Sequence, residues 1–151
     1  MARAQASSRE VVLKPSAAKT ATGAGSSLTV PEGYSQVQVW VDCTARSGTS
    51  PTLDLKIQDA RTGAASADLE GAQPTGTVVW DDFAAFTQMT NTGQRTMRIV
   101  ASTSSEAAAA DGALTAGTIR AGAISGPWRV KWVIGGTNPS FTFSVVAKFI
   151  P

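Results

Sequence analysis

Alternation of apolar and polar side chains with a period of two is the feature that most constrains this chain. The clearest run, residues 35–46, places one apolar set on a common side: Val37, Val39, Val41 and Cys43. The same period recurs in four further runs: 52–60, 95–102, 128–134 and 141–150. Because successive side chains of a strand point to opposite faces, this period indicates strands with one buried face.

Glycine and proline separate these runs. Residues 47–51 lie between the first two strands, and residues 135–139 lie between the last two. Short glycine-containing connections between alternating runs are typical of hairpins. The sequence therefore predicts two hairpins, 35–46 with 52–60 and 128–134 with 141–150. The phrases TSPTLDLKIQ and TNPSFTFSVV share a turn, a proline and a strand, although they do not form a true repeat.

The rest of the chain offers shorter elements. We expect a short first strand at 10–14, a loop at 15–25, a strand at 26–30 and a short strand at 77–80. In residues 81–89 the spacing of Phe83 and Phe86 fits either one helical turn or a bulged strand. Seven or eight short strands without a convincing helix predict an all-β fold, a single-domain antiparallel β-sandwich that is jelly-roll-like.

We expect three parts in the chain. Residues 1–10 are small and polar and are predicted to form a flexible N-terminal arm. Residues 11–151 are predicted to form the β-sandwich domain. Its segment 103–127 is rich in Ala, Gly, Ser and Thr and is expected to be a surface insert. The alternation also predicts a core that includes these residues: Leu55, Ile57, Val130, Trp132, Phe143 and Val145.

The residue inventory argues against catalysis. The chain has no histidine and a single cysteine, Cys43. This excludes imidazole bases, Cys-His nucleophiles and an internal disulfide. Asp81 and Asp82 are neighbours on a strand and should point to opposite faces, so they do not form a carboxylate pair. No calcium-loop spacing occurs. We therefore predict no enzymatic activity, no cofactor and no metal.

Charge is unevenly distributed along the chain. Residues 1–20 and 112–151 are basic, whereas residues 59–82 are acidic. Such segments either pair with copies of the chain or with a charged partner, or they are simply solvated. No lysine and arginine run is dense enough to indicate nucleic acid. Neither a signal peptide nor an apolar run of membrane length is present, so we expect synthesis in the cytoplasm and no membrane partner.

Five residues are candidates for an interface: Arg3, Arg9, Trp40, Arg129 and Lys131. Trp40 lies on the polar face of its strand, where a tryptophan either forms an interface or is covered within the subunit. Arg129 and Lys131 project from the polar face of 128–134 and could meet an acidic surface or remain solvated. Trp128 and Trp132 share the apolar face and are expected in the core rather than in a sugar-binding platform.

Three blocks resemble a family of small structural proteins of tailed-phage virions. They are SGTSPTLDLKIQDA, VVWDDFAAFTQMTNTGQRTMRIV and WRVKWVIGGTNPSFTFSVVAKF, within residues 35–102 and 128–150. The resemblance implies a β-sandwich virion protein with a role in head decoration or a minor structural role. The insert 103–127 and the basic N-terminal arm depart from the pattern of the family.

The function expected from this resemblance is that of a capsid decoration, or cement, protein located on the capsid surface of the virion. Its partners would be the major capsid protein and further copies of itself, in a homotrimer that matches the threefold points of a capsid lattice. Two alternatives stay open. One is a structural protein of the neck, tail or baseplate, and the other is a carbohydrate-binding β-sandwich module on the virion.

Overall fold

The fold is all-β, and the prediction of that class is confirmed. The structure, a computed structural model, describes residues 7–101, 114–120 and 124–151. Within them, the chain forms seven strands and no helix. The strands are β1 (Arg9–Lys19), β2 (Gly23–Ala24), β3 (Leu28–Thr29), β4 (Gln36–Thr62), β5 (Val78–Ala85), β6 (Gly93–Val100) and β7 (Pro127–Ile150). All of them belong to one antiparallel sheet.

The two longest strands, β4 and β7, pair with each other along almost their whole length. The ladder runs from Gln36 opposite Ile150 to Asp59 opposite Trp128. The two predicted hairpins are therefore wrong. Residues 47–51 and 135–139 are not hairpin turns, because each lies inside a continuous strand whose partner on both sides of the segment is the other long strand.

Those two glycine- and proline-containing segments meet each other and form a corner. Gly48 and Gly136 both have positive φ, at 105° and 109°. A Cβ atom on Gly48 would lie 2.7 Å from the carbonyl oxygen of Asn138, and one on Gly136 would lie 2.8 Å from that of Ser50. Glycine is thus required twice, in reciprocal positions, where the two backbones cross closely. The shared rhythm of the two sequence phrases has this structural origin.

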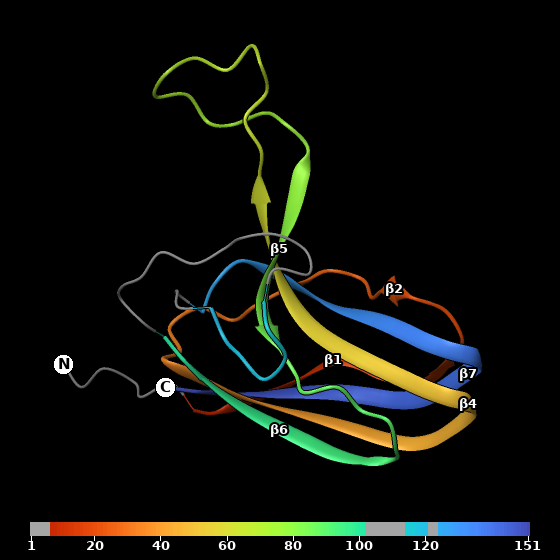
Figure 1. Ribbon diagram of the computed structural model, residues 1–151. Helices are drawn as coiled ribbons and strands as arrows, with labels where there is room; N and C mark the ends of the chain where they lie inside the picture. Colours follow the sequence, from red (N-terminus) through yellow and green to blue (C-terminus); the bar gives the residue numbers. More distant parts are fainter. Residues whose placement is uncertain (1–6, 102–113, 121–123) are drawn as a thin grey trace.

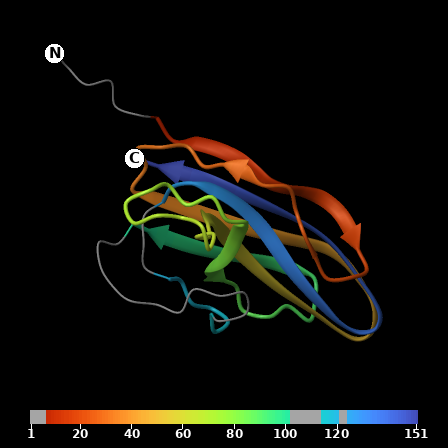
Figure 2. The ribbon, with the colours of Figure 1, turned by 90° about the horizontal axis from the view of Figure 1, so that it is seen from above.

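At the corner both strands bend, and the sheet folds over on itself (Figure 1). Layer one, as we call it, contains β1, residues 140–150 of β7, residues 36–47 of β4, and β6. Layer two contains β2, β3, residues 127–135 of β7, residues 52–62 of β4, and β5. Figure 2 shows the strands of the two layers lying over one another. The layers are halves of one sheet, so the sandwich and jelly-roll descriptions stay predictions.

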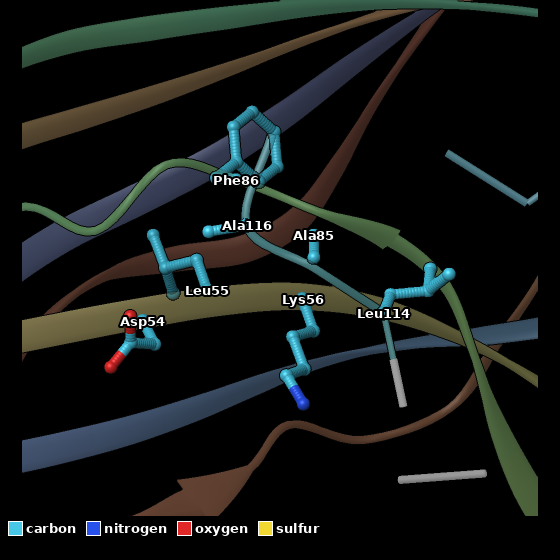
Figure 3. A pocket seen from close by; sticks show the side chains of 7 residues that line it. All are labelled: Asp54, Leu55, Lys56, Ala85, Phe86, Leu114 and Ala116. Carbon is cyan, nitrogen blue, oxygen red and sulfur yellow. The ribbon is translucent and has the colours of Figure 1, made fainter. Parts of the chain in front are cut away.

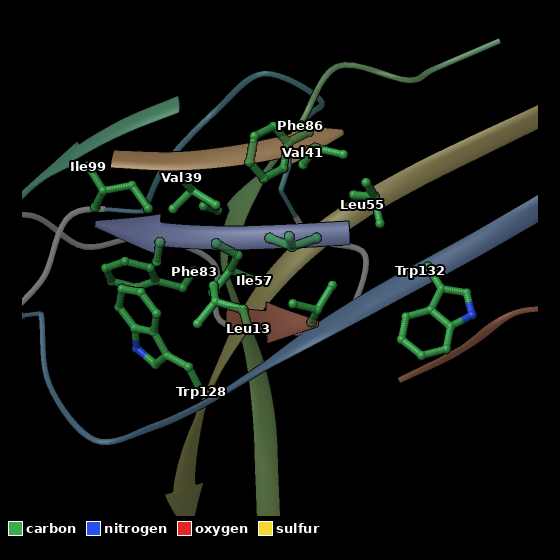
Figure 4. Packing of buried hydrophobic residues seen from close by; sticks show 14 of the residues in the cluster. Leu13, Val39, Val41, Leu55, Ile57, Phe83, Phe86, Ile99, Trp128 and Trp132 are labelled. Atoms are coloured by element: carbon green, nitrogen blue, oxygen red, sulfur yellow. The ribbon is translucent and has the colours of Figure 1, made fainter. Parts of the chain in front are cut away.

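The core lies between the layers and confirms the six predicted core residues, all of which are buried. Aromatic contacts join the two halves: the ring centroids of Trp128 and Phe149 are 5.9 Å apart, as are those of Trp132 and Phe143. Figure 4 shows Val39 and Val41 of layer one in the same cluster as Leu55 and Ile57 of layer two. Burial of these side chains provides the main stabilisation of the fold.

The N-terminal region differs from the prediction in two ways. Arg9 and Glu10 begin β1 and pair with Phe149 and Lys148, so these two residues do not belong to the arm predicted for residues 1–10. Residues 1–6 of that prediction lie outside the described residues. The strand also continues to Lys19, through residues predicted as a loop. The strand continues because the backbone of these residues pairs with the edge of β7. Their side chains are small and show little alternation of apolar and polar residues, so the sequence alone does not indicate a strand.

Lys14 closes one end of the core from this edge strand. Its Nζ donates to the carbonyl oxygens of Phe143, at 2.8 Å, and Pro15, at 3.0 Å, and lies 3.9 Å from the centre of the Phe143 ring. Burial lowers the pKa of Lys14 to about 8, and the charge of Lys19 contributes to this shift. The register shifts on both sides of Lys14 interrupt the ladder, as is common in protected sheet edges.

Residues 81–89 adopt the bulged-strand alternative. In the ladder with β4, Ile57 pairs with Ala84 and Gln58 pairs with Asp82, so Phe83 is the extra residue and points into the core. The insert 103–127 is described at 114–120 and 124–127. There it is not only surface, because Ile124 is buried and the Ile119 backbone forms a bridge with Ala84.

Candidate interaction surfaces

A hairpin rises from layer two, away from the body of the molecule (Figure 1). We call residues 59–81 the projecting hairpin; it contains the end of β4, the loop 63–77 and the start of β5. Its strands pair from Asp59 opposite Asp81 to Thr62 opposite Val78. The Gly63 amide then donates to the carbonyl oxygen of Thr77 at 2.9 Å. The sequence predicted only a long loop followed by a short strand here.

Asp68 organises the tip of the projecting hairpin. Its carboxylate accepts hydrogen bonds from the backbone amides of Ala65, at 2.6 Å, and Thr75, at 3.0 Å, and from the Thr75 hydroxyl. These bonds, led by that of the hydroxyl, lower the pKa of Asp68. The loop therefore has internal order, and it presents the next residue, Leu69, with 79% of its surface exposed.

A buried polar cluster lies at the base of the projecting hairpin. Asp82 is fully buried and accepts from Lys56 Nζ and Gln58 Nε2, each at 3.0 Å. Gln58 in turn accepts from Arg129 Nε at 2.8 Å. The Arg129 guanidinium lies 4.4 Å from the centre of the Trp80 ring. Charge-assisted hydrogen bonds and this cation–π contact fix the hairpin to β7.

Two further acids of the segment 59–82 form ion pairs within the chain. Asp59 forms an ion pair with Arg120, and Asp81 forms one with Arg61 at 2.6 Å. Three of the five acids, Asp59, Asp81 and Asp82, thus meet basic residues of their own chain, which the sequence did not predict. As predicted, Asp81 and Asp82 have different partners and share no site.

The five interface candidates do not form one patch. Arg3 lies outside the described residues. Arg9 is exposed at the start of β1, and Trp40 is partly exposed on the outer face of layer one. Arg129 and Lys131 are partly buried on the outer face of layer two, where Arg129 belongs to the cluster with Gln58 and Trp80. Their interface role stays a prediction.

The surface hollows of the described residues differ in size, and one that is lined by Pro51, Thr52 and Asn91 among others holds about 370 Å³. The one in Figure 3 is lined by Leu55, Phe86, Leu114 and their neighbours and holds about 120 Å³. Sites for small molecules are usually about 300–1,000 Å³. In the described part of the chain, no group of three or more His, Cys, Asp and Glu side chains is placed to hold a metal ion. Nor does this part contain a helix able to cross a membrane.

Sequence reasoning missed the buried cluster because its members look like surface residues. Lys56 and Gln58 occupy the polar positions of an alternating strand, where solvent exposure is the usual outcome. The signal that could have revealed them is the run of Trp80, Asp81 and Asp82 within a strand. Two carboxylates beside a tryptophan need cationic partners once the strand is packed.

Comparisons with known proteins leave the chain without an assigned family. No family model, no curated protein and no solved structure matches it.

Proposed function

We propose that the chain is a non-enzymatic structural protein of a tailed-phage virion, and specifically a decoration protein that binds the lattice of the major capsid protein. The sequence resemblance provides the class. The structural observation that supports it is the projecting hairpin, an ordered element that exposes Leu69 at its tip. The hairpin extends from the two layers of the sheet and the core between them, which we call the frame. An exposed leucine on an ordered loop is suited to insertion into a partner surface.

The position of the resembling blocks agrees with this proposal. They include the corner, residues 52–60 of β4, and nearly all of β5, β6 and β7. These strands form most of the hydrogen-bonded ladders of the frame and contribute most of its buried side chains. A frame of this kind holds its projections in fixed positions, so that binding does not require ordering the hairpin at a cost of about 1–2 kcal/mol per residue.

The aromatic side chains give no support to a sugar-binding platform. Trp128 and Trp132 are buried, and the two partly exposed tryptophans, Trp40 and Trp80, lie on different layers. A platform would need several exposed rings in one patch. A place in the neck, tail or baseplate would use the same frame and hairpin, and the number of copies in the virion distinguishes it from head decoration.

Self-association belongs to the same proposal. Decoration sites at local threefold points favour a ring of three copies, and binding through three hairpins at once multiplies weak contacts. The capsid surface of the virion is the location that follows, with the major capsid protein as partner.

Particles that lack this protein are expected to lose DNA at lower temperature and to survive osmotic shock less well than complete particles. Adding the purified protein should restore survival. The variant Leu69→Asp should restore it poorly, because a charge at the hairpin tip opposes insertion into an apolar site. The matched control is Val133→Asp, which places the same charge on an exposed valine of the body. Equal survival with and without the protein would contradict the proposal.

A further inference from the structure

The outer face of layer one carries an ordered pattern of charge. One row of paired residues crosses all four strands, from Glu10 on β1 through Lys148 on β7 and Gln38 on β4 to Arg98 on β6. The row begins with an acid at one sheet edge and ends with an arginine at the other. Arg98 is held in place by Gln36, whose Oε1 accepts from Nε at 3.0 Å and from Nη2 at 2.6 Å.

The next row on the same face is mostly apolar. It runs from Val12 through Val146 and Trp40 to Thr96. Val12 is 56% exposed, and Trp40 and Val146 are partly exposed. At the end of β6, Val100 adds a further apolar side chain that is 52% exposed. Figure 1 shows this face at the underside of the molecule, with no other described strand beneath it.

We propose that this face binds a second copy of the same chain, with the β1 side of one copy against the β6 side of the other. In that arrangement Glu10 of one copy meets Arg98 of the next. In the apolar row, Val146 meets Trp40, and Val12 meets Thr96. The opposite choice, β1 against β1, would place Glu10 against Glu10. Like charges at an interface are strongly unfavourable, so the charge pattern selects the occupant and its orientation.

The arrangement fits closed symmetry about an axis parallel to the strands. Two copies face to face, or three copies around the axis, both bring β1 sides against β6 sides. Packed sheets lie about 10 Å apart with their strands nearly aligned, which allows the apolar row to be buried on both copies. The inference concerns the free protein and does not depend on where in the virion it acts.

The test uses charge reversal in the purified full-length chain, with oligomeric state measured by light scattering over a range of concentrations. Glu10→Arg and Arg98→Glu are each expected to weaken self-association about tenfold or more, since about 1.4 kcal/mol is enough for a factor of ten. The double variant E10R/R98E should restore it, because the opposite charges again face each other. The controls are Glu32→Arg and Arg46→Glu, exposed residues away from this face.

Two further measurements keep the test decisive. Trp40→Ala should also weaken association, and thermal melting at low concentration should show that each variant is folded. A wild-type protein that is monomeric at all concentrations would overturn the inference. So would a double variant that associates no better than the single ones, or controls that dissociate as readily as the variants of the face.

Discussion

A Gly48→Ala variant is expected to lose about 2–4 kcal/mol of the free energy of unfolding, a large share of the stability of a domain of this size. The added Cβ would lie 2.7 Å from the carbonyl oxygen of Asn138 and 2.9 Å from that of Thr137. Both are backbone atoms of the partner strand and cannot move as a side chain can. The φ of 105° adds strain of its own. Urea unfolding measures the loss.

The matched control is Gly33→Ala. Gly33 also has positive φ, at 84°, but a Cβ atom there would meet nothing within 4 Å. Its variant should show only the cost of the backbone conformation, about 1–2 kcal/mol. Gly136→Ala should resemble Gly48→Ala, because the two positions are reciprocal. If Gly48→Ala costs no more than Gly33→Ala, the two strands do not cross closely at the corner and the predicted hairpins become the better description.

Asp82→Ala is expected to cost about 3–5 kcal/mol, because it removes the carboxylate of a buried ion pair. The Lys56 side chain is only 11% exposed and would lose the carboxylate 3.0 Å from its Nζ. Gln58, which is fully buried, would lose the acceptor of its amide as well. The loss should be visible in the free energy of unfolding and in the exchange of backbone amides in the projecting hairpin.

A suitable control is Asp54→Ala, on the same strand as Lys56. Asp54 accepts from Gln88 in an exposed contact, and losing it should cost less than about 1 kcal/mol. The double variant K56M/D82L should be more stable than Asp82→Ala, since it removes both charges of the pair. Equal stability of the Asp82→Ala and Asp54→Ala variants would show that the cluster does not anchor the hairpin.

The strand faces could be predicted because alternation is a local signal. Val37, Val39 and Val41 are buried as predicted, and so are Phe143 and Val145. Each follows from the period of two and the need to bury one face of a sheet. The bulge at Phe83 was one of two predicted alternatives, because the spacing of Phe83 and Phe86 does not distinguish it from one helical turn.

Strand pairing could not be predicted in the same way. Glycine and proline in 47–51 and 135–139 are compatible both with a tight reversal and with a bend inside a long strand. The choice depends on a partner almost ninety residues away, as Thr49 pairs with Thr137. The same limit applies to Gln58 and Asp82, whose burial depends on the bulge and on the contact of Arg129 with Trp80.

The number of copies of this protein in purified virions tests the central proposal most directly. Quantitative mass spectrometry against the major capsid protein gives this number. We predict hundreds of copies, in a fixed ratio to the major capsid protein, because decoration sites repeat over the whole lattice. Absence from purified virions would contradict a structural role, and a copy number limited to a single ring would contradict head decoration.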